Sequence, residues 1–296
     1  MPRVLGVDVS LGRGLDVALV EDAALTRTWS RVGPGGLAGL LLDEAPDAVA
    51  IDAPPRPGLG LLRHEGVRRS LPVPPEPGRH LDRRVAEYEL ARRGIGSHQT
   101  HHDESKLFSW MTAGFEAFAA ARAAGYPPFL GEGDPAHRAL EAFPYAGYVA
   151  LAGCLSPGRR VRLPWRRAVL EAAGLRGLPE DATIDLVDAA CAGLVGVRVL
   201  SGEGSWVGHP QEGAIVLPVP RLADRYRRCA APNAPPRPPA AAERLCECGC
   251  GAPARRRFLP GHDARLRARL LHEARAGRAA ADELRRLGWE HFLEGD

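Results

Sequence analysis

The sequence predicts a mixed α/β domain followed by a small Cys/His module, and three observations lead to this prediction. Short apolar runs near the N-terminus alternate with turn residues, as in a meandering sheet, and longer helical patterns follow them. A Pro/Ala-rich stretch at residues 230–242 then precedes three crowded cysteines and a histidine. We therefore expect an α/β domain at residues 1–228, a semi-rigid linker at 229–243, and a zinc-type module with an arginine-rich helical tail at 244–296.

The order of the expected elements narrows the fold class. Strands are predicted at residues 4–9, 16–20, 25–32 and 48–52, with a helix at 36–44 before the last of them. Three meandering strands, a helix and a further strand form the ribonuclease-H-like core, a mixed sheet flanked by helices. The sugar-kinase and actin superfamily shares this order. After a Pro/Gly-rich loop at 54–78, helices are expected at 81–92, 108–124 and 182–200, and strands at 137–143 and 214–217.

Composition limits the class of protein. With 296 residues, 45% of them hydrophobic, the chain can bury one sizeable core and still carry an appendage. Lys106 is the only lysine, a bias that GC-rich coding explains better than selection for phosphate binding. The N-terminus lacks the features of a secretion signal and no apolar run is long enough to span a bilayer, so we expect a soluble cytoplasmic protein without membrane contact.

The six cysteines fall into two groups. Cys154, Cys191 and Cys229 are isolated in the sequence, and the other three lie within five residues. Such crowding favours metal ligation in a reducing compartment over a disulfide framework. We expect the three isolated cysteines to stand alone.

Four aspartates lie where a carboxylate site of this fold is expected. Asp8 lies in the first apolar strand, Asp52 ends the fourth, and Asp185 and Asp188 share one face of the late helix. Carboxylates that meet in a cleft repel one another unless a cation compensates them. Oxygen ligands suit Mg²⁺ or Mn²⁺, and paired divalent ions activate water in phosphodiester hydrolysis.

Each aspartate also has a structural interpretation. A strand aspartate beside a glycine turn, such as Asp8, often bonds only loop amides, and Asp52 before two prolines fits a turn. The Asp185 and Asp188 pair fits a solvated helix face. The small apolar residues around the pair, among them Ala189 and Gly193, instead favour a helix packed close to the sheet.

Several unconnected motifs resemble one protein family. They are GVDVS at residues 6–10, AIDAPPRPG at 50–58, RRVAEYELARRGIGSH at 83–98, WMTAGFEAF at 110–118, LEAFPYAGY at 140–148, TIDLVDAACAG at 183–193 and EGAIVLP at 212–218. In this order they resemble the predicted RNase H-like nucleases known as domain of unknown function 429, over roughly residues 3–220. The resemblance implies an RNase H-like fold with catalytic and metal-binding acids at Asp8, Asp52, Asp185 and Asp188.

The same resemblance adds two acids as secondary catalytic candidates and leaves one stretch unmatched. Glu87 and Glu141 match the family pattern, whereas the histidines of GSHQTHHDES depart from it. His98 and His102 form a possible metal pair, but their loop context favours a polar loop that faces solvent or substrate.

The C-terminal segment predicts a structural zinc site. Cys246, Cys248, Cys250 and His262 supply three thiolates and an imidazole, the ligands of a closed tetrahedral Zn²⁺ site. The C-x-C spacing departs from the usual C-x₂₋₄-C knuckle, and free surface thiols are the alternative. Eight arginines against two acids at residues 251–278 indicate either a phosphate-binding surface or a basic, solvated helix face.

These features favour a metal-dependent nuclease, a hydrolase that uses Mg²⁺ or Mn²⁺ and binds DNA or RNA. One alternative is a nucleic-acid-binding or regulatory protein without catalysis. The other is an ATP-using phosphotransferase of the same superfold, although GVDVSLGRG is a poor phosphate loop.

Overall fold

The chain divides into two compact units, residues 1–230 and 231–296. The computed structural model describes residues 1–10, 12–158, 161–230, 244–254, 257–259, 261–274 and 278–292. The expected linker lies outside the described residues from position 231 onward. No helix within the described ranges is long and apolar enough to cross a membrane.

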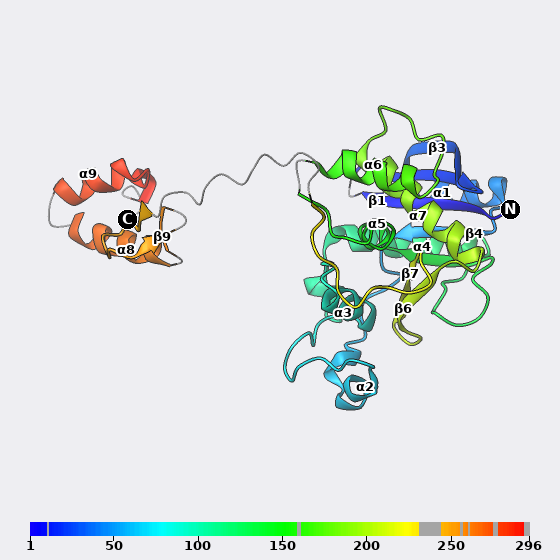
Figure 1. Cartoon of the computed structure of the whole chain (residues 1–296), viewed down its shortest axis with the longest axis horizontal. Helices are drawn as coiled ribbons and strands as arrows, with labels where there is room; N and C mark the ends of the chain where they lie inside the picture. The colour runs from blue at the N-terminus through cyan, green and yellow to red at the C-terminus, as the bar shows by residue number, and fades with distance from the viewer. Residues whose placement is uncertain are drawn as a thin grey trace. The chain divides into compact units, whose positions relative to one another are not determined.

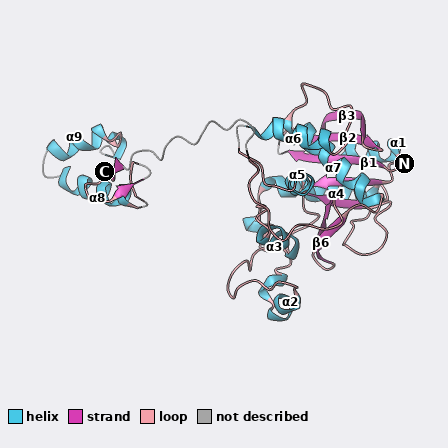
Figure 2. Cartoon of the chain, viewed as in Figure 1, coloured by secondary structure: helices cyan, strands magenta, loops and turns pink. Residues whose placement is uncertain are grey.

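The first unit contains a mixed sheet of seven strands flanked by helices (Figures 1 and 2). The strands are β1 (Arg3–Ser10), β2 (Gly14–Glu21), β3 (Ala24–Val32), β4 (Ala48–Asp52), β5 (Ala139–Ala142), β6 (Ser205–His209) and β7 (Gly213–Leu217). They lie in the order β3-β2-β1-β4-β5-β7-β6, and β2 and β6 run antiparallel to their neighbours. The order β3-β2-β1-β4-β5 is that of the ribonuclease-H-like core, which confirms the predicted fold class.

Helices cover both faces of this sheet. They are α1 (Pro34–Glu44), α2 (Glu65–Ser70), α3 (Val85–Arg92), α4 (Ser109–Ala123), α5 (Pro144–Ala152), α6 (Arg162–Ala172) and α7 (Ile184–Leu200), with 3₁₀ turns η1 (Leu61–Arg63) and η2 (Glu104–Lys106). The strands alternate their side chains between the two faces. Val4 and Ala50 therefore pack under α7, and Leu5 and Ile51 pack on the opposite side with residues of α1 and α4.

Several expected boundaries are wrong for identifiable reasons. Pro144 does not simply end a strand but begins α5, because proline fits the first turn of a helix, where no N–H is needed. The expected loop at 54–78 contains η1 and α2, and β6 was not predicted. The helix expected from residue 81 begins at Val85.

Two of the isolated cysteines do not stand alone. Cys154 follows α5 and forms a disulfide with Cys229, 75 residues later. Leu155 also accepts a backbone hydrogen bond from the Cys229 N–H. These contacts attach the last residues of the first unit to α5, so Cys229 belongs to this unit and not to a linker. Cys191 is a free, buried thiol.

The described residues of the second unit form a small hairpin and two helices. Its elements are β8 (Arg244–Leu245), β9 (Pro253–Ala254), α8 (His262–Ala274), α9 (Arg278–Arg286) and the 3₁₀ turn η4 (Glu290–Phe292). Its core contains Leu266 and Leu270 of α8 with Leu284 and Leu287. These four leucines form a small core. A unit of this size needs additional stabilisation, which a metal bound to the cysteines would provide.

Candidate active site

The sheet register brings Asp8 and Asp52 together. Strands β1 and β4 are parallel, and these two residues are paired at the carboxyl end of their ladder. Paired residues point to the same face of a sheet, and here it is the face that α7 covers. The pairing of β1 with β4 therefore places the carboxylates of Asp8 and Asp52 next to each other.

Helix α7 adds the third carboxylate, because it approaches the sheet unusually closely. A Cβ atom on Gly6 would lie 2.0 Å from the backbone oxygen of Ala189, and one on Gly193 would lie 2.6 Å from Val20. Glycine at both positions lets the helix backbone rest directly on β1. The predicted close packing of this helix is thus observed.

One turn of α7 places Asp188 over the strand ends. The Thr183 side chain accepts a hydrogen bond from the Leu186 N–H (3.1 Å) and fixes the start of the helix. Asp188 then contributes a carboxylate oxygen that lies within 4.8 Å of one oxygen each of Asp8 and Asp52. Asp185 lies outside this group and pairs instead with Arg13, at 3.1 Å.

An arginine enters the aspartate cluster, defined as Asp8, Asp52 and Asp188. Arg166 of α6 is 5% exposed and its guanidinium forms an ion pair with Asp188. The Tyr148 hydroxyl lies 2.8 Å from the other Asp188 oxygen, and its ring lies 5.1 Å below the Arg166 guanidinium. The Nε of Arg166 has no hydrogen-bond partner among the described residues. Neither Arg166 nor Tyr148 was predicted from the sequence.

Burial and mutual repulsion make these carboxylates hard to ionise. Burial, followed by repulsion from Asp188, raises the pKa of Asp8 to about 8. Burial and the neighbouring Asp8 carboxylate raise the pKa of Asp52 well above its ordinary value. Burial also raises the pKa of Asp188, and the positive charge of Arg166 opposes that rise.

The three carboxylates together fit a hard divalent cation. They provide oxygen ligands from β1, β4 and α7, and Arg166 compensates only part of their charge. A divalent cation would relieve the repulsion that raises their pKa values.

Glu87 and Glu141 lie elsewhere, around a buried arginine. The Arg84 guanidinium bonds both Glu141 oxygens, at 2.8 Å to Oε2, and its Nε lies 3.1 Å from Glu87. Glu87 also accepts the Thr100 N–H at 2.9 Å. All three charged side chains are at most 5% exposed. The structure thus joins these two glutamates to Arg84 and not to the aspartate cluster.

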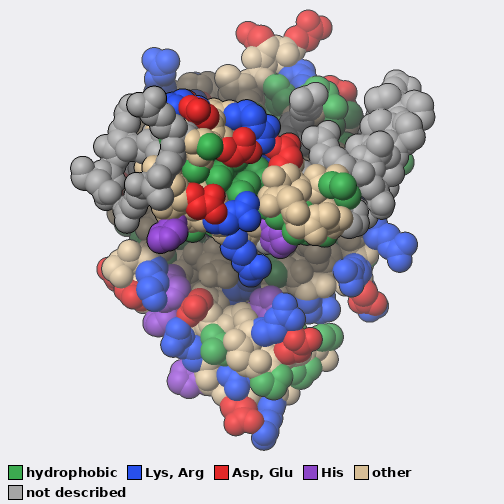
Figure 3. All heavy atoms as spheres, turned by 90° about the vertical axis from the view of Figure 1, so that its left-hand side faces the viewer, with side chains coloured by type: hydrophobic (Ala, Val, Ile, Leu, Met, Phe, Trp, Pro, Cys, Tyr) green, Lys and Arg blue, Asp and Glu red, His purple; other side chains and the backbone are tan. Residues whose placement is uncertain are grey.

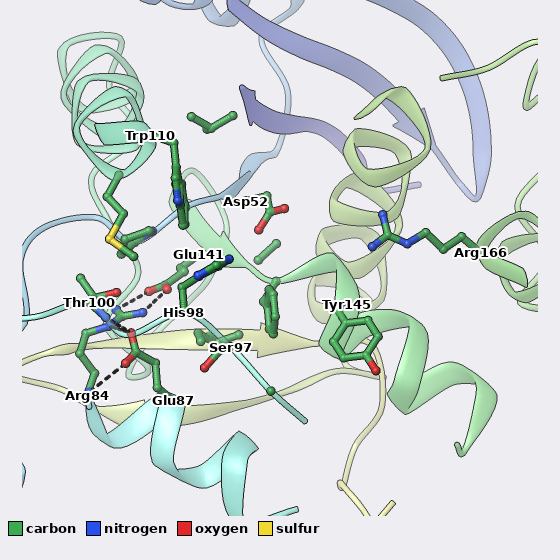
Figure 4. Close-up of a pocket in the computed structure, with 18 of the residues that line it drawn as sticks. Asp52, Arg84, Glu87, Ser97, His98, Thr100, Trp110, Glu141, Tyr145 and Arg166 are labelled. Carbon is green, nitrogen blue, oxygen red and sulfur yellow. Dashed lines mark hydrogen bonds and ion pairs between the residues drawn. The ribbon is translucent and has the colours of Figure 1, made fainter. Parts of the chain in front are cut away.

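A cavity of about 630 Å³ opens beside the cluster (Figure 4). Asp52 and Arg166 line it on one side, and the Arg84 network lies at another. Trp110 and His98 complete a further wall, and Tyr145 projects from the start of α5. Of the three aspartates in the cluster, Asp52 lines the cavity and is therefore accessible to a small molecule or to one residue of a polymer.

The two histidines of the possible metal pair have different neighbours, and His98 contacts the rings of Phe108 and Trp110. His102 groups instead with His101 and Asp82, whose ligand atoms lie within 4.8 Å of one another. His101 Nε2 lies 3.3 Å from Asp82, which also pairs with Arg63. Since Arg63 already provides a positive charge there, the group resembles an ordinary ion-pair network.

No protein-family model matches the chain, and no curated protein matches it. A solved structure of RuvC from Thermus thermophilus matches with 17% sequence identity and a TM-score of 0.35, over 68% of this chain and 95% of that one. The resemblance to domain of unknown function 429 therefore stays an expectation.

The second unit gathers its predicted ligands. Cys246, Cys248, Cys250 and His262 each have a ligand atom within 4.8 Å of the others. The Cys248 sulfur lies 3.2 Å from His262 Nδ1 and 3.3 Å from the Cys246 sulfur. Three sulfurs and one ring nitrogen are the ligand set of a structural zinc site.

The backbone explains how such short spacing works. Cys246 donates its N–H to Ala252 (2.9 Å), so residues 246–252 form a tight loop between β8 and β9. Gly249 and Gly251 have positive φ angles of 83° and 72°, which favour glycine. His262 begins α8 and reaches back to the sulfurs.

Many charged side chains of the second unit are paired. Arg257 contacts Glu247 at 2.6 Å, and Arg286 contacts Glu283 at the same distance. Acidic side chains lie among the basic ones in the space-filling view (Figure 3). Arg265 of α8 is exposed and presents its charge to solvent. The described arginines thus form an interrupted basic surface.

Proposed function

We propose that the first unit is a metal-dependent hydrolase that cleaves phosphodiester bonds in nucleic acid. The single observation that carries this proposal is the convergence of Asp8, Asp52 and Asp188, from three separate elements, beside an accessible cavity. Such a site accepts Mg²⁺ or Mn²⁺, which would polarise the phosphate and activate a water.

In this proposal the residues in and around the aspartate cluster have distinct roles. Asp8, Asp52 and Asp188 hold the metal, and the Tyr148 hydroxyl orients Asp188 through its 2.8 Å hydrogen bond. Arg166 lies where it can leave Asp188 for a phosphate oxygen, because its guanidinium already borders the cavity. Asp185, Glu87 and Glu141 support the site from outside the cluster.

We further propose that the second unit binds Zn²⁺ through Cys246, Cys248, Cys250 and His262 and contributes affinity for nucleic acid. The proximity of the four ligands supports the first role, and the exposed Arg265 supports the second. We propose an organisation with a domain at 1–230, a linker at 231–243 and a module at 244–296, because the disulfide of Cys229 moves the first boundary from the expected residue 228 past this cysteine.

One observation favours a second function, nucleic-acid binding without hydrolysis. Arg166 supplies a positive charge inside the aspartate cluster and so replaces part of what a metal would provide. A protein that relies on this arginine would bind nucleic acid and leave it intact.

Substitution of the ligands distinguishes the two functions. We expect Asp8→Asn and Asp52→Asn to lower Mn²⁺-dependent cleavage of labelled DNA and RNA by more than about 100-fold, since residues that merely orient metal ligands often account for 10- to 100-fold. Asp43→Asn is the matched control, because Asp43 is exposed on α1. Binding of both substrates by the wild-type protein without any cleavage would favour the second function.

A further inference from the structure

The cavity beside the aspartate cluster has aromatic walls that the proposed hydrolysis does not use. Trp110, Phe143 and Tyr145 line it together with His98. Trp110 and His98 have rings 5.7 Å apart at an interplanar angle of 66°, an edge-on contact. Aromatic rings that border an open cavity present faces on which another flat ring can stack.

A partly exposed aromatic group extends this wall towards solvent. Phe108 is 50% exposed, although it is a large apolar side chain, and it contacts His98 at 5.1 Å. It precedes α4, two residues before Trp110. Phe108, His98 and Trp110 form what we term the aromatic rim, a surface of ring side chains that leads from solvent to the cavity.

Positive charge lies on another wall of the same cavity. Arg166 and the exposed Arg162 both line it. The Nε of the buried Arg166 lacks a hydrogen-bond partner among the described residues, although a buried donor normally has one. An anionic oxygen bound beside Arg166 would satisfy this donor when the guanidinium turns from Asp188 towards the cavity that it lines. By contrast, the buried Arg84 is fully engaged with Glu141 and Glu87.

We infer that this cavity holds one unpaired nucleotide, with its base against the aromatic rim and its phosphate near Arg166. The inference rests on the proposed function, because the aspartate cluster then lies next to the phosphate. A cavity of about 630 Å³ is in the size range of pockets that enclose a small ligand. A base in a duplex is covered by its neighbours and its partner, so it must leave the stack to enter. The substrate is therefore single-stranded or locally unpaired nucleic acid.

The test measures binding of the full-length protein without catalysis. The probes are a fluorescein-labelled oligothymidylate of about 15 nucleotides and a duplex of the same length, in EDTA. Trp110→Ala should weaken binding of the single strand about tenfold, since stacking on an aromatic side chain contributes roughly 1–3 kcal/mol per base, and should leave duplex binding unchanged. Trp206→Ala is the matched control, because Trp206 is 39% exposed on β6 and does not line the cavity.

Two further measurements distinguish the loss of stacking from misfolding of the Trp110→Ala variant. Trp110→Phe keeps a stacking ring and should retain most single-strand affinity. An oligonucleotide that contains 2-aminopurine should lose fluorescence when it binds the wild-type protein, because stacking quenches this base, and lose much less with Trp110→Ala. Equal single-strand affinity of wild type and Trp110→Ala, with equal quenching, would overturn the inference.

The outcomes separate this inference from the proposed function. If the wild-type protein cleaves nucleic acid but Trp110→Ala binds and cleaves single strands as well as the wild type does, the inference fails and the hydrolase stands. If no divalent ion supports cleavage while single-strand binding depends on Trp110, the hydrolase fails and the nucleotide pocket stands.

Discussion

Burial and the neighbouring negative charges both raise the pKa of Asp8, and this shift predicts how the stability of the protein depends on pH. The pKa of the Asp8 carboxyl is about 8 in the metal-free fold, because of burial and then Asp188, against an ordinary value of 3.8. Below about pH 4 both the folded and unfolded chains are protonated there, so the residue has no effect. Between about pH 4 and pH 8 the Asp8 carboxyl is ionised in the unfolded chain but stays protonated in the folded chain. The metal-free protein should lose stability as pH rises through this window.

Asp8→Asn removes that penalty. We expect its melting temperature without metal to exceed that of the wild type near pH 8, by roughly 2–4 °C for each kcal/mol of relief, and the difference to shrink near pH 4.5. Added Mn²⁺ should raise the wild-type melting temperature and leave the variant almost unchanged. Calorimetry of both proteins, with Asp43→Asn as control, provides the measurement. A difference that does not vary with pH would contradict the assigned cause.

The residues of the site differ in how far the sequence reveals them. Asp8 and Asp52 are detectable because an acid in an apolar strand is rare and the expected sheet order makes the two strands neighbours. The sequence does not show which of Asp185 and Asp188 joins the cluster, because that depends on how α7 is rotated about its axis relative to β1. Arg166 is one of 38 arginines in the chain, and nothing in its local pattern distinguishes it. Its burial depends on α6 packing over Tyr148, a tertiary contact.

The contact between α7 and β1 controls the site at the level of elements. A methyl group on Gly6 would meet Ala189 O at 2.0 Å and Gly193 N at 2.4 Å, both backbone atoms that cannot rotate away. Gly6→Ala should therefore push α7 from the sheet and destabilise the first unit by about 3 kcal/mol or more. Because Asp188 moves with the helix, Mn²⁺ affinity should fall as well.

Substitution of a second glycine should change the stability in the opposite direction, so it serves as the control. Gly39 lies within α1, and a Cβ atom there would meet nothing within 4 Å. Gly39→Ala should raise stability by up to about 1 kcal/mol, because alanine favours the helix. Urea unfolding of the two variants measures both effects. If Gly6→Ala were as stable as the wild type, the close approach of α7 would not be a constraint on the fold.

The elements themselves were predicted unevenly. The first three strands, α1 and β4 follow from their alternation and turn residues, because neighbouring residues decide those patterns. The helix α5 was missed because PYAGYVALA is apolar on all sides and shows no helical periodicity. The strand β6 is short and partly exposed, and pairing with β7 defines it. The Cys154–Cys229 disulfide joins residues 75 positions apart, which no local pattern indicates.

The molecule as a whole combines a unit with a large core and a unit with a small one. The core of the second unit depends on a few leucines, whereas the first buries both faces of a seven-stranded sheet. The stability of the second unit should therefore depend on its metal. The four clustered ligands make this dependence testable in the intact chain, because α8 also carries a histidine outside the cluster.

His262→Ala and His272→Ala compare a proposed ligand with an exposed histidine on the same helix. We expect the wild type and His272→Ala to contain one zinc equivalent, and His262→Ala to lose it readily to a chelator, because three thiolates leave the tetrahedron incomplete.

Without the metal, α8 should open, so trypsin should cleave the second unit while the first stays intact. Affinity for nucleic acid should also fall and depend less steeply on salt, since ordered arginines release counterions from phosphates. Metal analysis and limited proteolysis of full-length proteins measure these effects. Zinc-free wild-type protein with a protease-resistant second unit would show that leucine packing alone suffices.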